Sequence, residues 1–105
     1  MIELVTEVLV APDGMDLDHP ELRSFSLTVR WRGVRGDTGR GGYAVIGRGD
    51  QHLSRGGNWR WEPEPRLQRH YRWATLDEAL AAAREALPTV KVMGHTWEDW
   101  QKLEA

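Results

Sequence analysis

The sequence has no cysteine, one phenylalanine and three methionines among its 105 residues. Because it has no thiols, disulfide bonds, thiolate zinc sites and cysteine nucleophiles are excluded. Long apolar runs are also missing: the longest near the start, residues 8–12, is short and follows Glu3 and Glu7. We therefore expect neither a signal peptide nor a membrane helix, and we predict a cytoplasmic protein that does not act at a membrane.

Basic residues are absent from the first 22 positions, which carry six acids. Residues 23–73 carry eleven bases and four acids, and residues 74–105 carry six acids and three bases. The net charge of −2 therefore conceals a strong segregation of charge. A basic middle segment favours a nucleic acid or an acidic partner. The alternative is that the acidic ends fold over the basic segment and neutralise it.

The length predicts a single domain spanning residues 1–105. Within this domain the composition separates three parts. Residues 1–22 form an acidic N-terminal strand with an irregular segment, residues 23–74 form a basic β meander, and residues 75–105 form a helix, a short strand and a second helix.

The basic segment alternates arginine with aromatic residues. Residues 24–32 form the clearest strand, because odd-numbered positions are apolar and even-numbered positions are polar. The same alternation recurs at residues 59–61 and 69–73. If these strands share one sheet, the inner face carries Trp31, Trp59, Trp61 and Trp73. The outer face then carries a partner-binding patch of Arg30, Arg32, Arg60 and Arg72.

Turn residues divide the remainder of the meander. We predict strands at residues 2–10 and 43–46, and a shorter one at 69–74. Gly56 and Gly57 predict a tight hairpin turn that pairs residues 51–54 with 58–62. Pro20, preceded by Asp18 as a cap, predicts one short helical turn in the acidic segment.

Two helices follow the meander. Thr75 with Glu78 forms a capping box, and Pro88 ends the apolar stripe that begins at Leu76. Val90 and Val92 predict a short strand, and Thr96 predicts the cap of a final helix. The predicted fold is α+β: an antiparallel meander of four or five strands, one helix on its aromatic face, and a short C-terminal helix.

Motifs for catalysis or cofactor binding are not found. The glycines of residues 33–42 fit neither a nucleotide-binding loop nor a dinucleotide fingerprint, and the Arg-Gly-Asp triplets at 35–37 and 48–50 are interpreted as turns. The four histidines lie far apart in the sequence, although a cluster in three dimensions stays open. Glu62 and Glu64 are the weak candidates for paired carboxylates. We predict no catalytic residues, no metal site and no cofactor.

Several segments together resemble a family of small uncharacterised accessory proteins of actinobacterial phages and prophages. The resemblance covers about two thirds of the chain, from residue 31 onward, and excludes the acidic start and the tryptophan-rich end. It implies an accessory role inside a bacterial host, without assigning an activity or site residues. The segments concerned are Trp31-Arg32-Gly33, Tyr43-Ala44-Val45, Leu53-Ser54-Arg55-Gly56-Gly57, Trp59-Arg60-Trp61-Glu62-Pro63, residues 76–86 and residues 90–96.

The sequence therefore favours a non-enzymatic binding protein that engages a host protein or a second copy of itself. Arginine with aromatic residues is also typical of nucleic-acid binding, through phosphate contacts and base stacking. Nucleic acid is the second hypothesis, and a small hydrolase with an unrecognised site is the third. Tryptophans on a covered face argue against base stacking.

Overall fold

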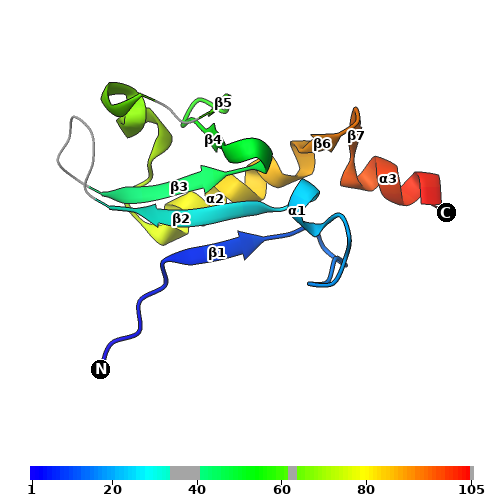
Figure 1. Cartoon of the computed structure of the whole chain (residues 1–105), viewed down its shortest axis with the longest axis horizontal. Helices are drawn as coiled ribbons and strands as arrows, with labels where there is room; N and C mark the ends of the chain where they lie inside the picture. The colour runs from blue at the N-terminus through cyan, green and yellow to red at the C-terminus, as the bar shows by residue number, and fades with distance from the viewer. Residues whose placement is uncertain (34–40, 62–63, 105) are drawn as a thin grey trace.

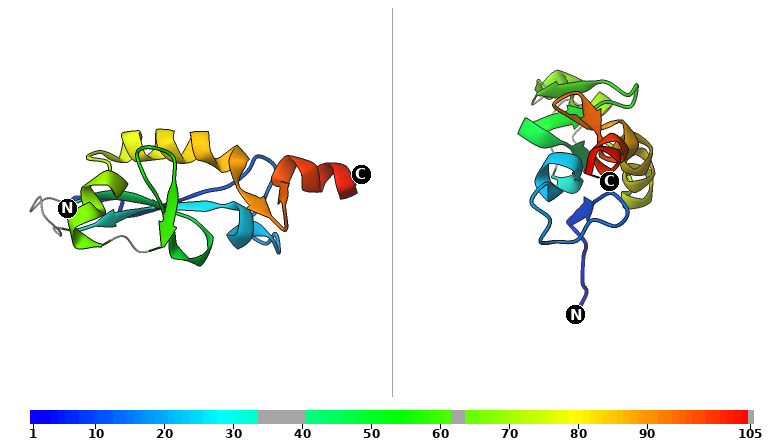
Figure 2. Two further views of the ribbon diagram at one scale, coloured as in Figure 1. Left: turned by 90° about the horizontal axis from the view of Figure 1, so that it is seen from above. Right: turned by 90° about the vertical axis from the view of Figure 1, so that its right-hand side faces the viewer.

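A computed structural model describes residues 1–33, 41–61 and 64–104. Five antiparallel strands form one sheet in the order β1-β2-β3-β4-β5, as the sequence predicts, and helix α2 runs along one face (Figures 1 and 2). A second, two-stranded sheet precedes the C-terminal helix. The strands are β1 Glu7–Val10, β2 Leu27–Arg32, β3 Gly42–Ile46, β4 Gln51–Leu53, β5 Trp59–Trp61, β6 Lys91–Val92 and β7 His95–Thr96.

The three α-helices differ in length. Helix α1 is one short turn, Leu22–Phe25, whereas α2 spans Leu76–Ala86 and α3 spans Trp97–Glu104. The described residues also form 3-10 helices at Arg48–Asp50, Pro65–Tyr71 and Leu87–Thr89.

The core lies between the sheet and α2. Leu27 and Val29 of β2 and Val45 of β3 are almost fully buried, and they face Ala79 and Ala83 of the helix. Alanine on the inner side of α2 lets the helix lie close to the sheet. We call this the helix-covered face, and the opposite side the open face.

The start of α2 follows the predicted capping box. The Thr75 hydroxyl oxygen accepts a hydrogen bond from the Glu78 backbone N–H at 3.2 Å. Thr96 and Asp99 make the reciprocal arrangement at α3, where each side chain accepts from the other residue's backbone N–H at 3.2 Å. Both helix starts are therefore fixed by local side-chain contacts.

Three predicted strands are wrong in their extent. The first begins at Glu7, and residues 2–5 lie outside the ladder, although the Thr6 carbonyl oxygen still accepts from the Trp31 backbone N–H at 2.7 Å. Ser24 and Phe25 belong to α1, and the predicted strand at 24–32 begins at Leu27. Residues 69–71 close the 3-10 helix Pro65–Tyr71, and the remainder of the predicted strand at 69–74 makes one bridge, between Trp73 and Tyr43.

The short helix in the acidic segment also differs from the prediction. It begins after Glu21 with no side-chain cap, and Asp16, not Asp18, accepts a backbone hydrogen bond there. The glycine hairpin is confirmed, because β4 pairs with β5, but its turn differs from the tight turn predicted. The Ser54 N–H donates to the Asn58 carbonyl oxygen at 2.7 Å, so residues 55–57 form the loop, and of its two glycines Gly57 alone has a positive φ, +87°.

The C-terminal helix is anchored by an aromatic cluster. Phe25 of α1 lies 5.4 Å from Trp97 and 5.9 Å from Trp100, measured between ring centroids. The Trp100 indole N–H also donates to the Val92 carbonyl oxygen at 3.2 Å. Phe25 therefore turns toward α3, and not into the core under α2. In the described part of the chain, no helix has the length and apolar character needed to cross a membrane.

Candidate interaction surface

The four predicted arginines lie on the open face of the sheet. Arg30 and Arg32 alternate with the buried residues of β2, and they pair with Ala44 and Gly42 of β3. Cross-strand partners share a face, so both arginine side chains project away from α2.

Arg60 and Arg72 reach the same face from other segments. Arg60 pairs with His52, which pairs with Ile46, and Ile46 pairs with Thr28 on the Arg30 side of β2. Arg72 has an extended backbone next to the Trp73 bridge. A Cβ added to Gly42 would lie 3.0 Å from the Arg72 Cβ, which places Arg72 over the open face. We call these four residues the arginine face.

His52 lies between the arginines and is buried. Burial lowers its pKa below the usual value of 6.5, and the positive charges of Arg72 and Arg32 lower it further. The Asp50 carbonyl oxygen lies 2.8 Å from Nδ1 and opposes this shift. The lowered pKa favours the neutral form of His52, so the side chain adds no positive charge to the arginine face.

The acidic N-terminal segment reaches the arginine face at one described ion pair. A Glu7 carboxylate oxygen accepts from the Arg30 guanidinium at 3.0 Å, and both side chains are about half exposed. Exposed pairs of this kind contribute little, so Glu7 lowers the local charge without closing the face. Beside it a hollow of about 330 Å³ is lined by Glu7, Leu9, Leu22, Arg23, Ser26, Thr28, Arg30, Ile46, Gly47 and Asp50.

The predicted burial of all four tryptophans is wrong for two of them. Trp59 and Trp73 pack against the core, but Trp31 is 42% exposed and Trp61 is 61% exposed. Trp61 ends the outermost strand, and Trp31 lies near the end of β2, against Tyr43 at 5.1 Å. A Cβ added to Gly41 would be 2.5 Å from the Trp31 ring, so Trp31 lies directly against the Gly41 backbone.

The described residues do not bring the candidate catalytic or metal-binding side chains together. Glu62, half of the weak carboxylate pair, lies outside the described residues, and Glu64 pairs with Arg66 at 3.0 Å. His19 packs edge-on against Trp97 and accepts from the Glu21 backbone N–H. Within the described ranges, no three histidine, aspartate or glutamate side chains are grouped so that they could hold a metal ion.

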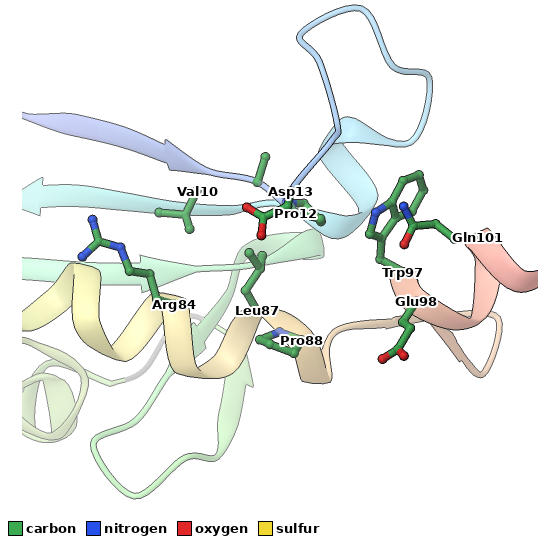
Figure 3. Close-up of a pocket in the computed structure, with 10 residues that line it drawn as sticks. Val10, Pro12, Asp13, Arg84, Leu87, Pro88, Trp97, Glu98 and Gln101 are labelled. Carbon is green, nitrogen blue, oxygen red and sulfur yellow. The ribbon is translucent and has the colours of Figure 1, made fainter.

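The sequence did not indicate two larger hollows. One, of about 520 Å³, lies where the end of β1 meets α2 and α3 (Figure 3); its lining is Val10, Ala11, Pro12, Asp13, Arg84, Leu87, Pro88, Trp97, Glu98 and Gln101. The other, of about 700 Å³, lies between the β4–β5 hairpin and α2. No local sequence pattern indicates either hollow, because each is lined by separate segments that only the tertiary fold brings together.

Comparison of the chain with family models, curated proteins and solved structures finds no match.

Proposed function

We propose that the protein is a non-enzymatic binding protein whose arginine face takes an acidic segment of a host protein. The observation that carries the proposal is the projection of Arg30, Arg32, Arg60 and Arg72 from one face of the sheet, opposite α2. Guanidinium groups pair with carboxylates in bidentate geometry, so a face with several arginines suits a partner rich in Asp and Glu. The resemblance to phage and prophage accessory proteins supports a role in the cytoplasm of a bacterial host.

Nucleic acid is the second candidate, favoured by exposure of Trp31 and Trp61. Exposed indoles can stack on bases, and arginines can contact phosphates. By strand alternation, however, these tryptophans project on the helix-covered side while the arginines project on the open side. A single strand of nucleic acid would have to pass around an edge of the sheet to contact both the tryptophans and the arginines. This geometry favours an acidic protein as the partner.

The test compares a labelled Asp/Glu-rich peptide with a labelled single-stranded oligonucleotide as salt is raised. We expect the peptide to bind at low salt, and Arg60→Glu to weaken its binding by about tenfold or more, because a repulsive charge replaces an attractive one. The matched control is Arg84→Glu, which makes the same change in charge on exposed α2, across the sheet from the arginine face.

The outcomes separate the two candidates. The second candidate would be favoured if the oligonucleotide binds and the logarithm of its binding constant falls with the logarithm of salt concentration at a slope of about −3 to −4. Arg60→Glu should then reduce the magnitude of this slope by about one unit. Binding of neither probe, or equal loss in Arg60→Glu and Arg84→Glu, would contradict a role for the arginine face.

A further inference from the structure

The hollow of about 700 Å³ lies on the helix-covered side of the sheet, where the β4–β5 hairpin comes close to α2 (Figure 2). Three parts of the chain line it: the hairpin, Trp73, and the side of α2 that faces the hairpin. Its volume falls within the range of about 300 to 1,000 Å³ that is typical of pockets for small molecules. None of the four arginines of the arginine face lines it.

Backbone hydrogen bonds hold the walls of this hollow in place. The Arg55 N–H, in the hairpin loop, donates to the His70 carbonyl oxygen at 2.8 Å. Trp73 and Tyr43 exchange two backbone hydrogen bonds, at 2.8 and 2.9 Å. The hairpin and the Trp73 segment are therefore fixed to the rest of the fold, and the hollow is formed without a ligand.

Two half-buried indoles, Trp59 and Trp73, line the hollow. Both also pack against the core, which restricts the movement of their rings. A Cβ added to Gly47 would lie 3.1 Å from the six-membered ring of Trp59, so this end of the indole lies close to backbone. Indole faces attract cations more strongly than the faces of phenylalanine or tyrosine do, because of the negative potential above the ring.

Alanine on α2 leaves space in front of these indoles. Ala81, Ala82 and Ala86 line the hollow, together with Leu53 of β4. Their side chains are apolar, and the three methyl groups occupy little volume. The apolar body of a ligand would therefore lose water-exposed surface on entering.

Two glutamates of α2 give the hollow negative charge. Glu78 and Glu85 are exposed, line the hollow, and lie seven residues apart, which places them on the same side of the helix. Neither carboxylate makes an ion pair with any described residue. Arg55 also lines the hollow, but its Nε donates to the Arg72 carbonyl oxygen at 2.8 Å. Two carboxylates and one guanidinium group leave a net negative charge.

The hydroxyl groups of the hollow make local hydrogen bonds to the backbone. The Ser54 oxygen accepts from the Asn58 N–H at 2.9 Å, and the Thr89 hydroxyl donates to the Ala86 carbonyl oxygen at 2.6 Å. A sugar would need several free donors and acceptors, and the glutamates would repel a phosphate. The lining therefore favours a ligand that is held by positive charge and apolar contact.

We propose that this hollow binds a small organic cation of the quaternary-ammonium class. Its methylated head lies against the indoles of Trp59 and Trp73, and Glu78 and Glu85 balance its charge. A quaternary ammonium group has no N–H to donate, so aromatic rings and nearby carboxylates are the groups that recognise it. The site lies across the sheet from the arginine face and does not depend on the proposed function.

An NMR titration that follows the indole N–H signals tests the site with choline as the probe. The control ligand is the neutral alcohol of the same shape, in which a carbon atom replaces the choline nitrogen. We expect choline to bind about tenfold more tightly than this alcohol. It should shift the signals of Trp59 and Trp73 and leave those of Trp97 and Trp100 in place. Equal binding of the two ligands, or no shift at Trp59 and Trp73 at about 10 mM choline, would overturn the proposal.

Substitutions on α2 test the charge without touching the core. Glu85→Gln should weaken choline binding by about threefold to tenfold, because it removes one of two nearby negative charges. The matched control is Glu98→Gln, the same change at an exposed glutamate of α3 that does not line this hollow. Ala81→Lys should abolish binding, because its ammonium group would lie within one turn of both Glu78 and Glu85. An equal loss in Glu85→Gln and Glu98→Gln would show a response to overall charge alone and would overturn the site.

A basic peptide is the alternative occupant of the hollow. Binding of a lysine-rich peptide that Glu85→Gln weakens, with no binding of choline, would assign the hollow to a protein partner and overturn the proposal. The site and the proposed function fail separately. Arg60→Glu changes the opposite face of the sheet and should leave choline binding unchanged.

Discussion

At the scale of single residues, position in the sheet decides what each side chain does. His52 is buried although it lies on the face opposite α2, where Ala44 and Ile46 are buried as well. Its low pKa keeps it neutral, so the burial adds no unpaired charge beside Arg32 and Arg72.

His52 should make stability depend on pH. Its folded-state pKa is below 6.5, so the unfolded chain takes up the proton first and the free energy of unfolding falls as pH drops below about 6.5. The contribution cannot exceed about 1.4 kcal/mol per pH unit. Urea unfolding between about pH 7.5 and 5.5 should give a shallower fall in His52→Gln. An equal change in the exposed control His95→Gln would contradict the assignment.

Trp59 and Trp61 offer a matched pair of truncations two residues apart. Trp59 packs against the core and Trp61 is 61% exposed. We expect Trp59→Ala to lower the free energy of unfolding by about 3 kcal/mol, and Trp61→Ala by less than about 0.5 kcal/mol. Chemical denaturation of both variants measures the difference. Similar losses would show that β5 is covered along its whole length.

At the scale of elements, the helices are held by different means. Helix α2 lies on the sheet through Ala79 and Ala83, within the main core. Helix α3 has its own small cluster, in which Phe25 contacts Trp97 and Trp100. Among the described atoms, the Trp97 indole N–H is buried without a hydrogen-bond partner. We expect α3 to open more readily than α2.

Phe25→Ala should release α3 before it affects the rest of the fold. The Phe25 side chain is almost fully buried, so its truncation should cost about 3 to 5 kcal/mol locally. Amide hydrogen exchange should accelerate along α3, while α2 amides stay protected. Uniform acceleration in both helices would show instead that α1, α2 and α3 unfold as one unit.

At the scale of the whole molecule, two surfaces project in different directions. The arginine face occupies the open side of the sheet, and the exposed residues 1–6 precede β1 at one edge. The principal extents of 49 × 35 × 19 Å describe a thin, elongated body, in which α3 extends one end and the N-terminal residues run out sideways (Figures 1 and 2).

The sequence by itself determined the features that depend on neighbours along the chain. Alternation in residues 27–32 placed Arg30 and Arg32 opposite the core, Thr75 fixed the start of α2, and Gly57 provides the positive φ of the β4–β5 turn. These follow from backbone geometry over a few residues. The pairing of the strands then decides that Arg60 and Arg72, from two other segments, lie on the same side of the sheet.

Only the tertiary structure decided what covers each face and where each strand stops. Phe25 fits the alternation of β2, but it belongs to α1 and packs against Trp97 and Trp100, which follow it by more than 70 residues in the sequence. Trp61 alternates as Trp59 does, yet it ends an outermost strand and stays exposed. Ile2 and Leu4 follow the alternation predicted for a strand, but they lie before the start of β1 and are exposed. Burial depends on the packing of distant segments, and a local pattern carries no information about that packing.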